Sequence, residues 1–160
     1  MKKKNIIIQK KIKDFFKKNR SKITFVHVDI SRTFRIKFIN KNNFFKKHYL
    51  IIKNITNNSV LWFPSFNYNF SKNKKFKIDK DKSQTDNFTE FFRSKLTKWR
   101  TSVPIFSICG DGSKPKINLK DPINPFGKKS FFHLLKNWKA GVFSLDSAAA
   151  RLRRNGTSLW

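Results

Sequence analysis

The sequence predicts an α/β fold in which a mixed β-sheet carries two helices packed on it, an α/β sandwich with a basic N-terminal extension and a basic C-terminal tail. Short apolar segments of strand length, the first of which alternates with polar residues, occupy the first half of the chain. Two later segments repeat apolar residues at helical spacing. The resulting order of strands, helix, strand, helix and strand is typical of helices layered on a sheet.

Three strands are predicted in the first half of the chain. The first runs from Ile23 to Phe38, and its alternation is interrupted between Asp29 and Thr33, where we expect a bulge or a tight bend. The second runs from His48 to Ile55 and the third from Val60 to Phe66. Asn57, Asn58 and Ser59 predict a turn between them.

Two helices are predicted in the second half. Asn87, three residues before Glu90, has the spacing of an N-cap with its reciprocal partner. The apolar residues of that helix are Phe88, Phe91, Phe92, Leu96 and Trp99. Ser130 is expected to cap the second helix, and Gly141 is expected to terminate it. Its apolar residues are Phe131, Leu134, Leu135 and Trp138.

The remaining segments of the second half read as loops and short strands. Residues 71 to 82 form a Lys-rich loop, and residues 113 to 127 contain three prolines and are expected to be a loop. A strand from Val103 to Cys109 leads into a turn at Gly110 to Gly112, and a last strand runs from Val142 to Leu145.

A chain of 160 residues is expected to form one domain with extensions. We place the α/β domain at residues 22 to 147, with segments near 40 to 56 and 114 to 129 that look inserted. Residues 1 to 21 form the N-terminal extension and 148 to 160 the tail. The apolar residues of an amphipathic helix in the extension are Ile8, Ile12, Phe15 and Phe16. An import peptide favours Arg and Ser and avoids acidic residues such as Asp14, so we interpret the extension as a contact to RNA.

The charge of the chain indicates a polyanionic partner. Its 37 Lys and Arg against 9 Asp and Glu leave a net charge of +28. The basic side chains repel one another unless a polyanion neutralises them. The basic residues are spread over the whole length and do not cluster beside an anchor, which favours nucleic acid over a membrane surface. No apolar run approaches the roughly 18 residues of a membrane helix, so no membrane span is expected.

Composition adds three further expectations. Nineteen Phe and four Trp are enough to build a core and to leave rings that stack on unpaired bases. The dominance of Lys, Asn, Ile and Phe, which have A- and T-rich codons, suggests an organellar genome, and we expect a mitochondrion or another organelle with such a genome. The single Cys excludes an internal disulfide and a zinc site made of Cys residues.

No residue pattern indicates catalysis, a metal or a cofactor. Asp79 and Asp81 are paired carboxylates, but they alternate with lysines in a polar loop where nothing would hold one of them protonated. The three His are isolated from one another. The glycines around Asp111 lack the spacing of a P-loop, although they would let an RNA phosphate approach the backbone closely. Cys109 reads as a small core residue.

Basic residues in loops and in the tail are the candidates for contacts with RNA. The segment from residue 148 to 155 departs from the Lys bias of the chain, because it is rich in Ala and Arg, and Arg forms bidentate contacts to phosphate and stacks on bases. Each lost phosphate contact is expected to lower the salt dependence of binding by about one unit. The predicted RNA-binding residues are Arg32, Arg35, Lys72, Lys74, Lys75, Lys114, Lys116, Arg151, Arg153, Arg154 and Asn155.

Read together, the segments between residues 22 and 156 resemble the family of small-subunit ribosomal protein eleven. Val26 to Thr33 is similar to the family pattern Ile-His-Ala-Ser-Phe-Asn-Asn-Thr, with direct matches at His27 and Thr33. Val60 to Ser65, ahead of a basic loop, is similar to Ala-Leu-Gly-Trp-Ala-Thr. Gly110 to Gly112 stands where the family has Gly-Pro-Gly.

The order of later segments extends this resemblance. A helix, Gly141, a short strand, Asp146 and finally Asn155-Gly156 follow as in the family. The chain departs from it in the two inserted segments, in a basic loop without glycines and in a tail reduced to residues 157 to 160. The resemblance implies a platform protein of the small subunit that binds ribosomal RNA near the messenger exit path, beside other ribosomal proteins.

Two alternatives remain open from the sequence. One is a basic ribosomal protein of another family, peculiar to its lineage. The other is an accessory subunit of an organellar membrane complex that uses its Phe-rich faces against protein or lipid. A nuclease is disfavoured, because the sequence has no convincing carboxylate or His cluster for a metal. We therefore expect a structural RNA-binding protein and not an enzyme.

Overall fold

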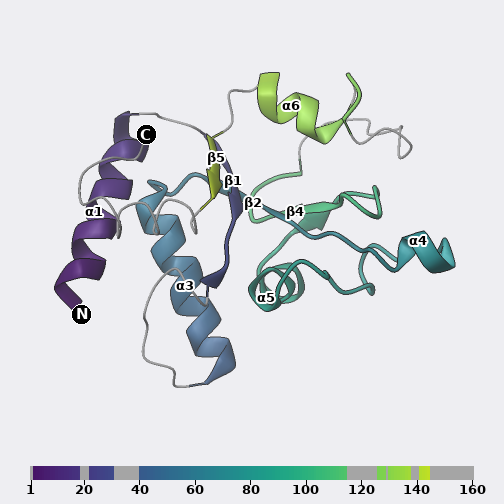
Figure 1. The fold of residues 1–160 in the computed structure, drawn as a ribbon, viewed down its shortest axis with the longest axis horizontal. Helices are drawn as coiled ribbons and strands as arrows, with labels where there is room; N and C mark the ends of the chain where they lie inside the picture. The colour runs from purple at the N-terminus through teal and green to yellow at the C-terminus, as the bar shows by residue number, and fades with distance from the viewer. Residues whose placement is uncertain are drawn as a thin grey trace. The chain divides into compact units, whose positions relative to one another are not determined.

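The computed structural model describes residues 2–18, 22–30, 40–114, 126–128, 130–137 and 141–144. The chain divides into two compact units, one made of residues 1–59 and 141–160 and the other of residues 60–140 (Figure 1). Both contain helices and strands, and the strands pair in parallel in the first unit and antiparallel in the second. The predicted α/β fold class, with a mixed sheet and helices packed on it, is confirmed.

The first unit contains two helices and a pair of parallel strands. These are α1 (Lys2–Lys18), β1 (Ile23–His27), α3 (Lys41–Ile55) and β5 (Gly141–Ser144). β1 pairs with β5 in a register that places Phe25 opposite Val142. The helix predicted in the N-terminal extension is present as α1 and lies beside α3 (Figure 1), where Lys13 Nζ donates to Asn54 Oδ1 at 2.7 Å. Since Ile12 and Phe16 are buried, α1 belongs to the folded unit.

The strand predicted from His48 to Ile55 is wrong, because these residues form the second half of α3. Isoleucines and an aromatic ring made the short segment look like a strand. A longer window that starts at Asn40 shows the helix, since the buried residues recur at spacings of three and four. They are Phe45, His48, Ile52 and Ile55. Asn40 caps the helix, and its side chain accepts a hydrogen bond from the Asn43 N–H at 2.9 Å.

The turn predicted at Asn57 to Ser59 is confirmed as the end of α3. Asn57 and Asn58 have φ values of 54° and 57°, a left-handed conformation that Asn tolerates better than most residues. The Asn58 N–H donates to the Lys53 carbonyl at 2.8 Å, which satisfies one of the last carbonyls of the helix. Ser59 then lies against β1, with its hydroxyl 2.8 Å from the hydroxyl of Thr24.

The second unit is built on three antiparallel strands. Its elements are β2 (Val60–Pro64), α4 (Phe70–Asn73), α5 (Asn87–Lys95), β3 (Trp99–Arg100), β4 (Ile108–Gly110) and α6 (Phe131–Asn137). β4 pairs with β2 on one side and with β3 on the other. The strand predicted at Val60 is therefore present, although it ends at Pro64. The last predicted strand is present as β5, which begins at Gly141.

Neighbouring residues of β2 attach α5 and α6 to opposite faces of this sheet. Consecutive side chains of a strand point to opposite sides. The Phe63 ring packs on Phe92 of α5 at 4.4 Å between centroids, whereas the Trp62 ring packs on Phe131 of α6 at 4.7 Å. In Figure 1 the two helices accordingly lie on either side of the β2–β4 pair. α6 begins as predicted, since the Ser130 hydroxyl accepts from the His133 N–H at 3.2 Å.

The predicted cap of α5 is off by one residue. The N-cap is Asp86, whose carboxylate accepts from the Thr89 N–H at 2.8 Å and from the Thr89 hydroxyl at 2.6 Å. Asn87 is the first helical residue. Glu90 does not close a reciprocal pair with the cap; its carboxylate accepts instead from the Ser83 N–H at 2.6 Å. A carboxylate serves a cap as well as an amide does and also suits the positive end of the helix.

The strand predicted from Val103 to Cys109 is reduced to β4, and β3 precedes it. Trp99 does not belong to the apolar face of α5, because the helix ends at Lys95 and Trp99 lies in β3. The chain leaves the helix at Thr97, whose hydroxyl donates to the Gly110 carbonyl of β4 at 2.8 Å. The residues between β3 and β4 form the turn of a hairpin closed by the bond from Thr101 N–H to the Ile108 carbonyl at 2.9 Å.

The turn after β4 has a packing role. A Cβ at Gly110 would come within 2.5 Å of both the Trp62 and the Trp99 rings, so only glycine fits there. The Asp111 side chain accepts from the Leu61 N–H at 2.9 Å, and the Gly112 carbonyl accepts from the Trp99 indole at 2.9 Å. The N–H groups of Gly110 and Asp111 donate within the protein, to the Thr97 hydroxyl at 3.1 Å and to the Leu61 carbonyl at 3.2 Å, so neither of them is free for a phosphate.

The cap of α5 gives a direct test of the fold. Replacement Asp86→Ala is expected to lower the free energy of unfolding by about 1 kcal/mol, because two hydrogen bonds to the first turn are lost. Asn87→Ala, one residue along, is expected to change it by less than about 0.5 kcal/mol. Urea unfolding followed by circular dichroism measures both. A larger loss for Asn87→Ala would contradict the assignment of the cap.

Candidate nucleic-acid interface

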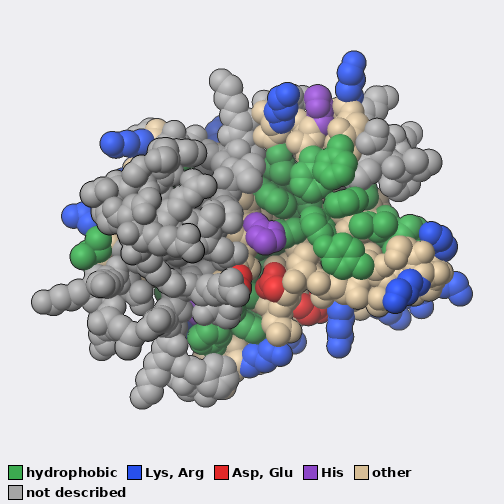
Figure 2. Space-filling model, in the orientation of Figure 1, with side chains coloured by type: hydrophobic (Ala, Val, Ile, Leu, Met, Phe, Trp, Pro, Cys, Tyr) green, Lys and Arg blue, Asp and Glu red, His purple; other side chains and the backbone are tan. Residues whose placement is uncertain are grey.

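A loop that carries six exposed lysines connects β2 to α5 in the second unit. We define the Lys-rich loop as residues 66–85, which include the segment 71 to 82 predicted as a loop and the short helix α4 within it. Its exposed lysines are Lys72, Lys74, Lys75, Lys77, Lys80 and Lys82. Figure 2 shows Lys side chains projecting around the position of α4, with an apolar patch between this position and α6.

The two ends of the Lys-rich loop are bonded to each other. The Gln84 N–H donates to the Phe66 carbonyl at 2.8 Å, and the Asn67 side chain donates to the Lys82 carbonyl at 3.3 Å. The Gln84 side chain forms two bonds with Asn69, one from the Asn69 N–H at 2.9 Å and one to its side-chain oxygen at 3.1 Å. The loop is therefore a closed structure with a defined path, and not a loose connection.

Arg100 of β3 holds this loop from beneath. Its side chain is buried, with 5% of the residue exposed. One terminal nitrogen donates to the carbonyl of Ile78, at 3.1 Å, and to the carbonyl of Asp81. The other donates to the Ser65 carbonyl at the end of β2. The guanidinium thus joins β3, the end of β2 and the middle of the Lys-rich loop, which a planar group with five N–H donors can do at once.

The Arg100 charge remains in place although it is buried. Desolvation lowers the pKa of Arg100 to about 10, and the nearby charge of Arg93 acts in the same direction. A pKa of about 10 keeps the group protonated at neutral pH. Carbonyl oxygens, the Ser65 and Ser107 hydroxyls at 3.2 Å from Nε and the face of Phe76 at 4.7 Å surround it. A buried, positively charged side chain therefore bonds to the backbone of the loop.

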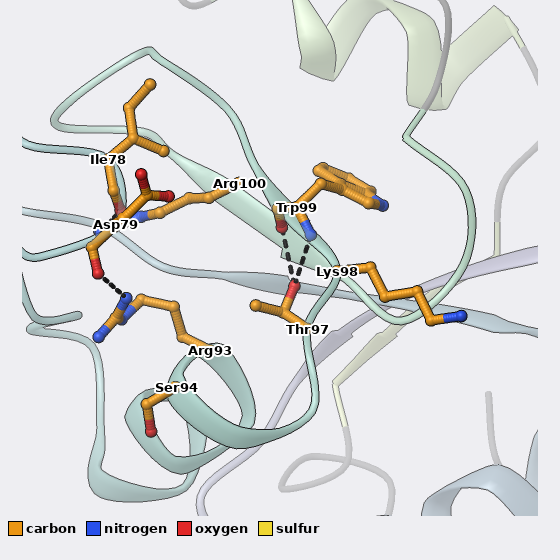
Figure 3. Close-up of a pocket in the computed structure, with 8 residues that line it drawn as sticks. All are labelled: Ile78, Asp79, Arg93, Ser94, Thr97, Lys98, Trp99 and Arg100. Carbon is orange, nitrogen blue, oxygen red and sulfur yellow. Dashed lines mark hydrogen bonds between the residues drawn. The ribbon is translucent and has the colours of Figure 1, made fainter.

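Glu90 and Arg93 of α5 form a second attachment. The Arg93 guanidinium donates twice to the Glu90 carboxylate at 2.8 Å and once to the Asp79 carbonyl at 3.1 Å, the bond drawn in Figure 3. Burial acts to raise the pKa of Glu90, but the bonds from Arg93 and from the Ser83 N–H, with the nearby Arg charges, lower it below its ordinary value. Glu90 thus stays ionised and connects Ser83 of the loop to the helix.

Asp79 and Asp81, the paired carboxylates of the loop, take part in contacts that hold the fold. Asp81 accepts a hydrogen bond from the Lys77 N–H at 2.9 Å and so closes the turn between them. The Asp79 carbonyl is one acceptor of the Arg93 side chain. Within the part of the chain that the structure describes, no group of three His, Cys, Asp or Glu is placed to hold a metal ion. The arrangement offers positive charge and N–H donors, which are the groups that bind phosphate.

The segment from Ile78 to Lys82 contributes to the lining of two pockets. One, with a volume of about 280 Å³, is the pocket of Figure 3, where Lys98 points away from the other labelled side chains. Its lining residues are Ile78, Asp79, Arg93, Ser94, Thr97, Lys98, Trp99 and Arg100. The other, of about 410 Å³, we call the amide pocket. Its lining residues are Asn67, Asn69, Asn73, Lys80, Asp81, Lys82, Ser83 and Gln84.

The structure describes four of the predicted RNA-binding residues. Lys72, Lys74 and Lys75 are exposed and lie together at α4, and Lys74 has a φ of 54° at the end of that helix. Lys114 is exposed beyond the turn after β4, on another part of the unit. The predicted residues that lie outside the described residues are Arg32, Arg35, Lys116, Arg151, Arg153, Arg154 and Asn155.

Sequence reasoning missed the residues that hold and extend this surface. Lys80 and Lys82 were visible beside Asp79 and Asp81, but the four alternating charges were weighed only for catalysis. Arg100 gave no signal, because the preceding Trp99 fitted the helical stripe of α5. A buried Arg is recognisable only when its acceptors are in place, and they come from residues far along the chain.

Cys109 is a core residue, as predicted. It is fully buried in β4, and its Sγ lies 3.8 Å from the Phe63 carbonyl. Burial raises the pKa of Cys109 to about 12, so the thiol is neutral at physiological pH. A neutral, buried thiol is a poor nucleophile.

A chain of aromatic rings forms the apolar patch beside the Lys-rich loop. Phe106 stands at its centre, 5.4 Å from Phe66 and 5.2 Å from Phe126, and Phe126 lies 5.2 Å from Phe132. Tyr68 continues the chain from Phe66 and is 49% exposed. Rings of this kind next to lysines suit contact with unpaired bases as well as with protein.

Comparisons of this chain with protein-family models, with curated proteins and with solved structures found no match. Among the described residues, no helix combines the length and the apolar character needed to cross a bilayer.

The role of Arg100 can be tested by unfolding. Arg100→Ala is expected to lower the free energy of unfolding by about 3 kcal/mol or more, since it leaves several buried acceptors without a donor. Arg100→Lys should recover less than half of this, because one ammonium cannot reach Ser65 and the loop carbonyls together. Lys98→Ala, an exposed cation two residues away, is the control and should change stability by less than about 0.5 kcal/mol. Equal losses for Arg100→Ala and Lys98→Ala would contradict the role given to Arg100.

Proposed function

We propose that the protein is a structural, RNA-binding constituent of the small subunit of a mitochondrial ribosome, related to small-subunit ribosomal protein eleven. One observation carries the proposal, namely six exposed lysines on a loop whose backbone is fixed from beneath by buried Arg100. In a chain with a net charge of +28, such a surface needs a polyanion.

The fixed path of the loop favours RNA as that polyanion. A loop that is ordered before binding loses less conformational freedom when it meets a partner. Lysines at defined positions can match the regular phosphates of a folded RNA, whereas a flexible basic tail gains only diffuse attraction. The function proposed is binding, with no chemical step, and phosphate contacts supply most of the affinity.

The order of elements supports the relation to small-subunit ribosomal protein eleven. β1 and β2 precede α5, and β4 with its Gly-Asp-Gly turn, α6 and β5 follow, in the sequence of strands and helices that the resemblance implies. The basic loop follows β2, as expected there. α3 falls within residues 40 to 56, the segment that looks inserted relative to the family.

The proposed compartment rests on composition. Lys, Asn, Ile and Phe dominate the chain, which fits an A- and T-rich organellar genome such as that of a mitochondrion. The proposed partners are ribosomal RNA of the small subunit and neighbouring ribosomal proteins near the path of the messenger RNA. Of the proposed contacts, Lys72, Lys74, Lys75 and Lys114 lie on described surface.

Sedimentation of the tagged protein from organelle lysate on a sucrose gradient, with and without ribonuclease, tests this proposal. The protein is expected to sediment with small-subunit RNA and to return to the top of the gradient after ribonuclease treatment. Migration with membranes that resists both salt and ribonuclease would reject the ribosomal function and favour an accessory subunit of a membrane complex.

The same gradient measures the part of the Lys-rich loop. A variant with Lys72→Ala, Lys74→Ala and Lys75→Ala is expected to leave the small-subunit fraction at a lower salt concentration than the wild type, because each lost phosphate contact lowers the salt dependence by about one unit. A matched variant with three exposed lysines outside the loop replaced, Lys46→Ala and Lys47→Ala on α3 and Lys95→Ala on α5, carries the same change of charge. Equal release of the two variants would show that net charge alone, and not the loop, determines binding.

A further inference from the structure

The amide pocket presents an unusual set of groups for a basic surface. Besides Lys80 and Lys82 it is lined by four side-chain amides. An amide offers either an oxygen or an NH₂ group to a ligand, depending on how it is turned. The bonds of the Lys-rich loop determine that orientation.

Backbone N–H groups fix the first two amides. The Asn69 N–H can only donate, so the Gln84 atom 2.9 Å away must be its oxygen. The Gln84 NH₂ group then faces Asn69 and donates to the Asn69 side-chain oxygen at 3.1 Å. This turns the NH₂ group of Asn69 away from Gln84. Among the described contacts that NH₂ group has no protein acceptor, and Asn69 is exposed.

The other two amides are fixed in the same way. The Asn73 oxygen accepts from the Lys75 N–H at 3.2 Å, which leaves the Asn73 NH₂ group to face solvent. The Asn67 oxygen accepts from the Phe70 N–H at 3.1 Å, and its NH₂ group is used on the Lys82 carbonyl. Asn69 and Asn73 therefore both present donors, and a second N–H of Gln84 adds another.

The two lysines of the pocket add positive charge to these donors. Lys80 and Lys82 are exposed and contribute ammonium groups. The acidic residue of the lining, Asp81, directs one carboxylate oxygen to the Lys77 N–H at 2.9 Å. A ligand that fills the pocket meets N–H groups from the amides and positive charge from the lysines, and it must supply acceptors to both.

We infer that the amide pocket binds one unpaired RNA nucleotide whose base presents carbonyl oxygens, uracil above all, with its phosphate held by Lys80 and Lys82. This deepens the proposed function, on which it rests, because it assigns base discrimination to a surface otherwise expected to bind phosphate alone. The volume of about 410 Å³ is sufficient for a base with its ribose.

The donor pattern separates the bases. Uracil offers two carbonyl oxygens to the NH₂ groups of Asn69 and Asn73. Adenine carries an amino group that would face these donors and leave a donor without an acceptor. Asn69 and Asn73 are exposed, so a base that displaces water from these donors without supplying an acceptor binds less tightly. Single-stranded RNA displays these base edges, whereas paired RNA hides them.

Fluorescence anisotropy with labelled octamers of uridine and of adenosine tests this inference on the full chain. The two RNAs carry the same charge, so the ratio of their dissociation constants isolates the base. The wild type is expected to bind oligo-uridine about tenfold more tightly. Asn69→Asp and Asn73→Asp keep the oxygen that the loop uses and lose the outward donor, and each is expected to bring the ratio towards one.

Asn87→Asp, an exposed exchange of the same type outside the pocket, is the control for added negative charge and should keep the ratio of the wild type. An unchanged preference in the two pocket variants would trace it to the stacking of oligo-adenosine and overturn the inference. Equal binding of both RNAs by the wild type would also overturn it while leaving the proposed function standing. Failure of the wild type to bind either RNA at low salt would overturn the proposed function itself.

Discussion

The buried guanidinium of Arg100 is the interaction on which the surface of the second unit depends. It takes the carbonyls of Ile78 and Asp81 from the Lys-rich loop and the carbonyl of Ser65 from the end of β2, which lie far apart in the sequence. A buried charge is costly unless polar groups surround it, so the loop and the strand stabilise Arg100 as much as Arg100 positions them. Without these carbonyls the burial of Arg100 would be destabilising, and without Arg100 the carbonyls would lose their donor.

This mutual support explains how a segment with six lysines keeps a defined path. The lysines repel one another, and in isolation such a segment would remain disordered. Here hydrogen bonds below the surface hold the loop in place despite this repulsion. They are the bonds from Arg100 to the loop carbonyls, those between Gln84 and Asn69 and those of the Glu90–Arg93 pair of α5. The ammonium groups are left at the surface, where a polyanion can reach them. The same bonds orient the amides of the neighbouring pocket, so the proposed phosphate contacts and the inferred base selection depend on one set of contacts.

The parts of the fold that follow from local pattern were predictable. The short apolar run from Val60 to Phe63 predicted β2, the spacing of Phe88 and Phe92 predicted α5, and Ser130 as a cap predicted α6. The failures have physical causes. His48 to Ile55 forms a helix because its partners begin at Asn40, outside the short window that looked like a strand. Trp99 and Arg100 left the helical pattern because the Thr97 hydroxyl bonds to Gly110, a contact made by the fold. The exposed lysines at α4 were identified from their charge alone. Arg100, which holds the loop that carries them, was not identified, because its role depends on carbonyls that are distant in the sequence.

Ultraviolet cross-linking of the protein to small-subunit RNA, followed by mass spectrometry of the linked peptides, tests the central claim most directly. The claim is that the Lys-rich loop held by Arg100 is an RNA surface. It predicts linked nucleotides on peptides within residues 66 to 85, and their loss in Arg100→Ala protein that is still folded, as judged by the circular dichroism of its helices. Links confined to other parts of the chain, or links to the loop that persist in that variant, would contradict it.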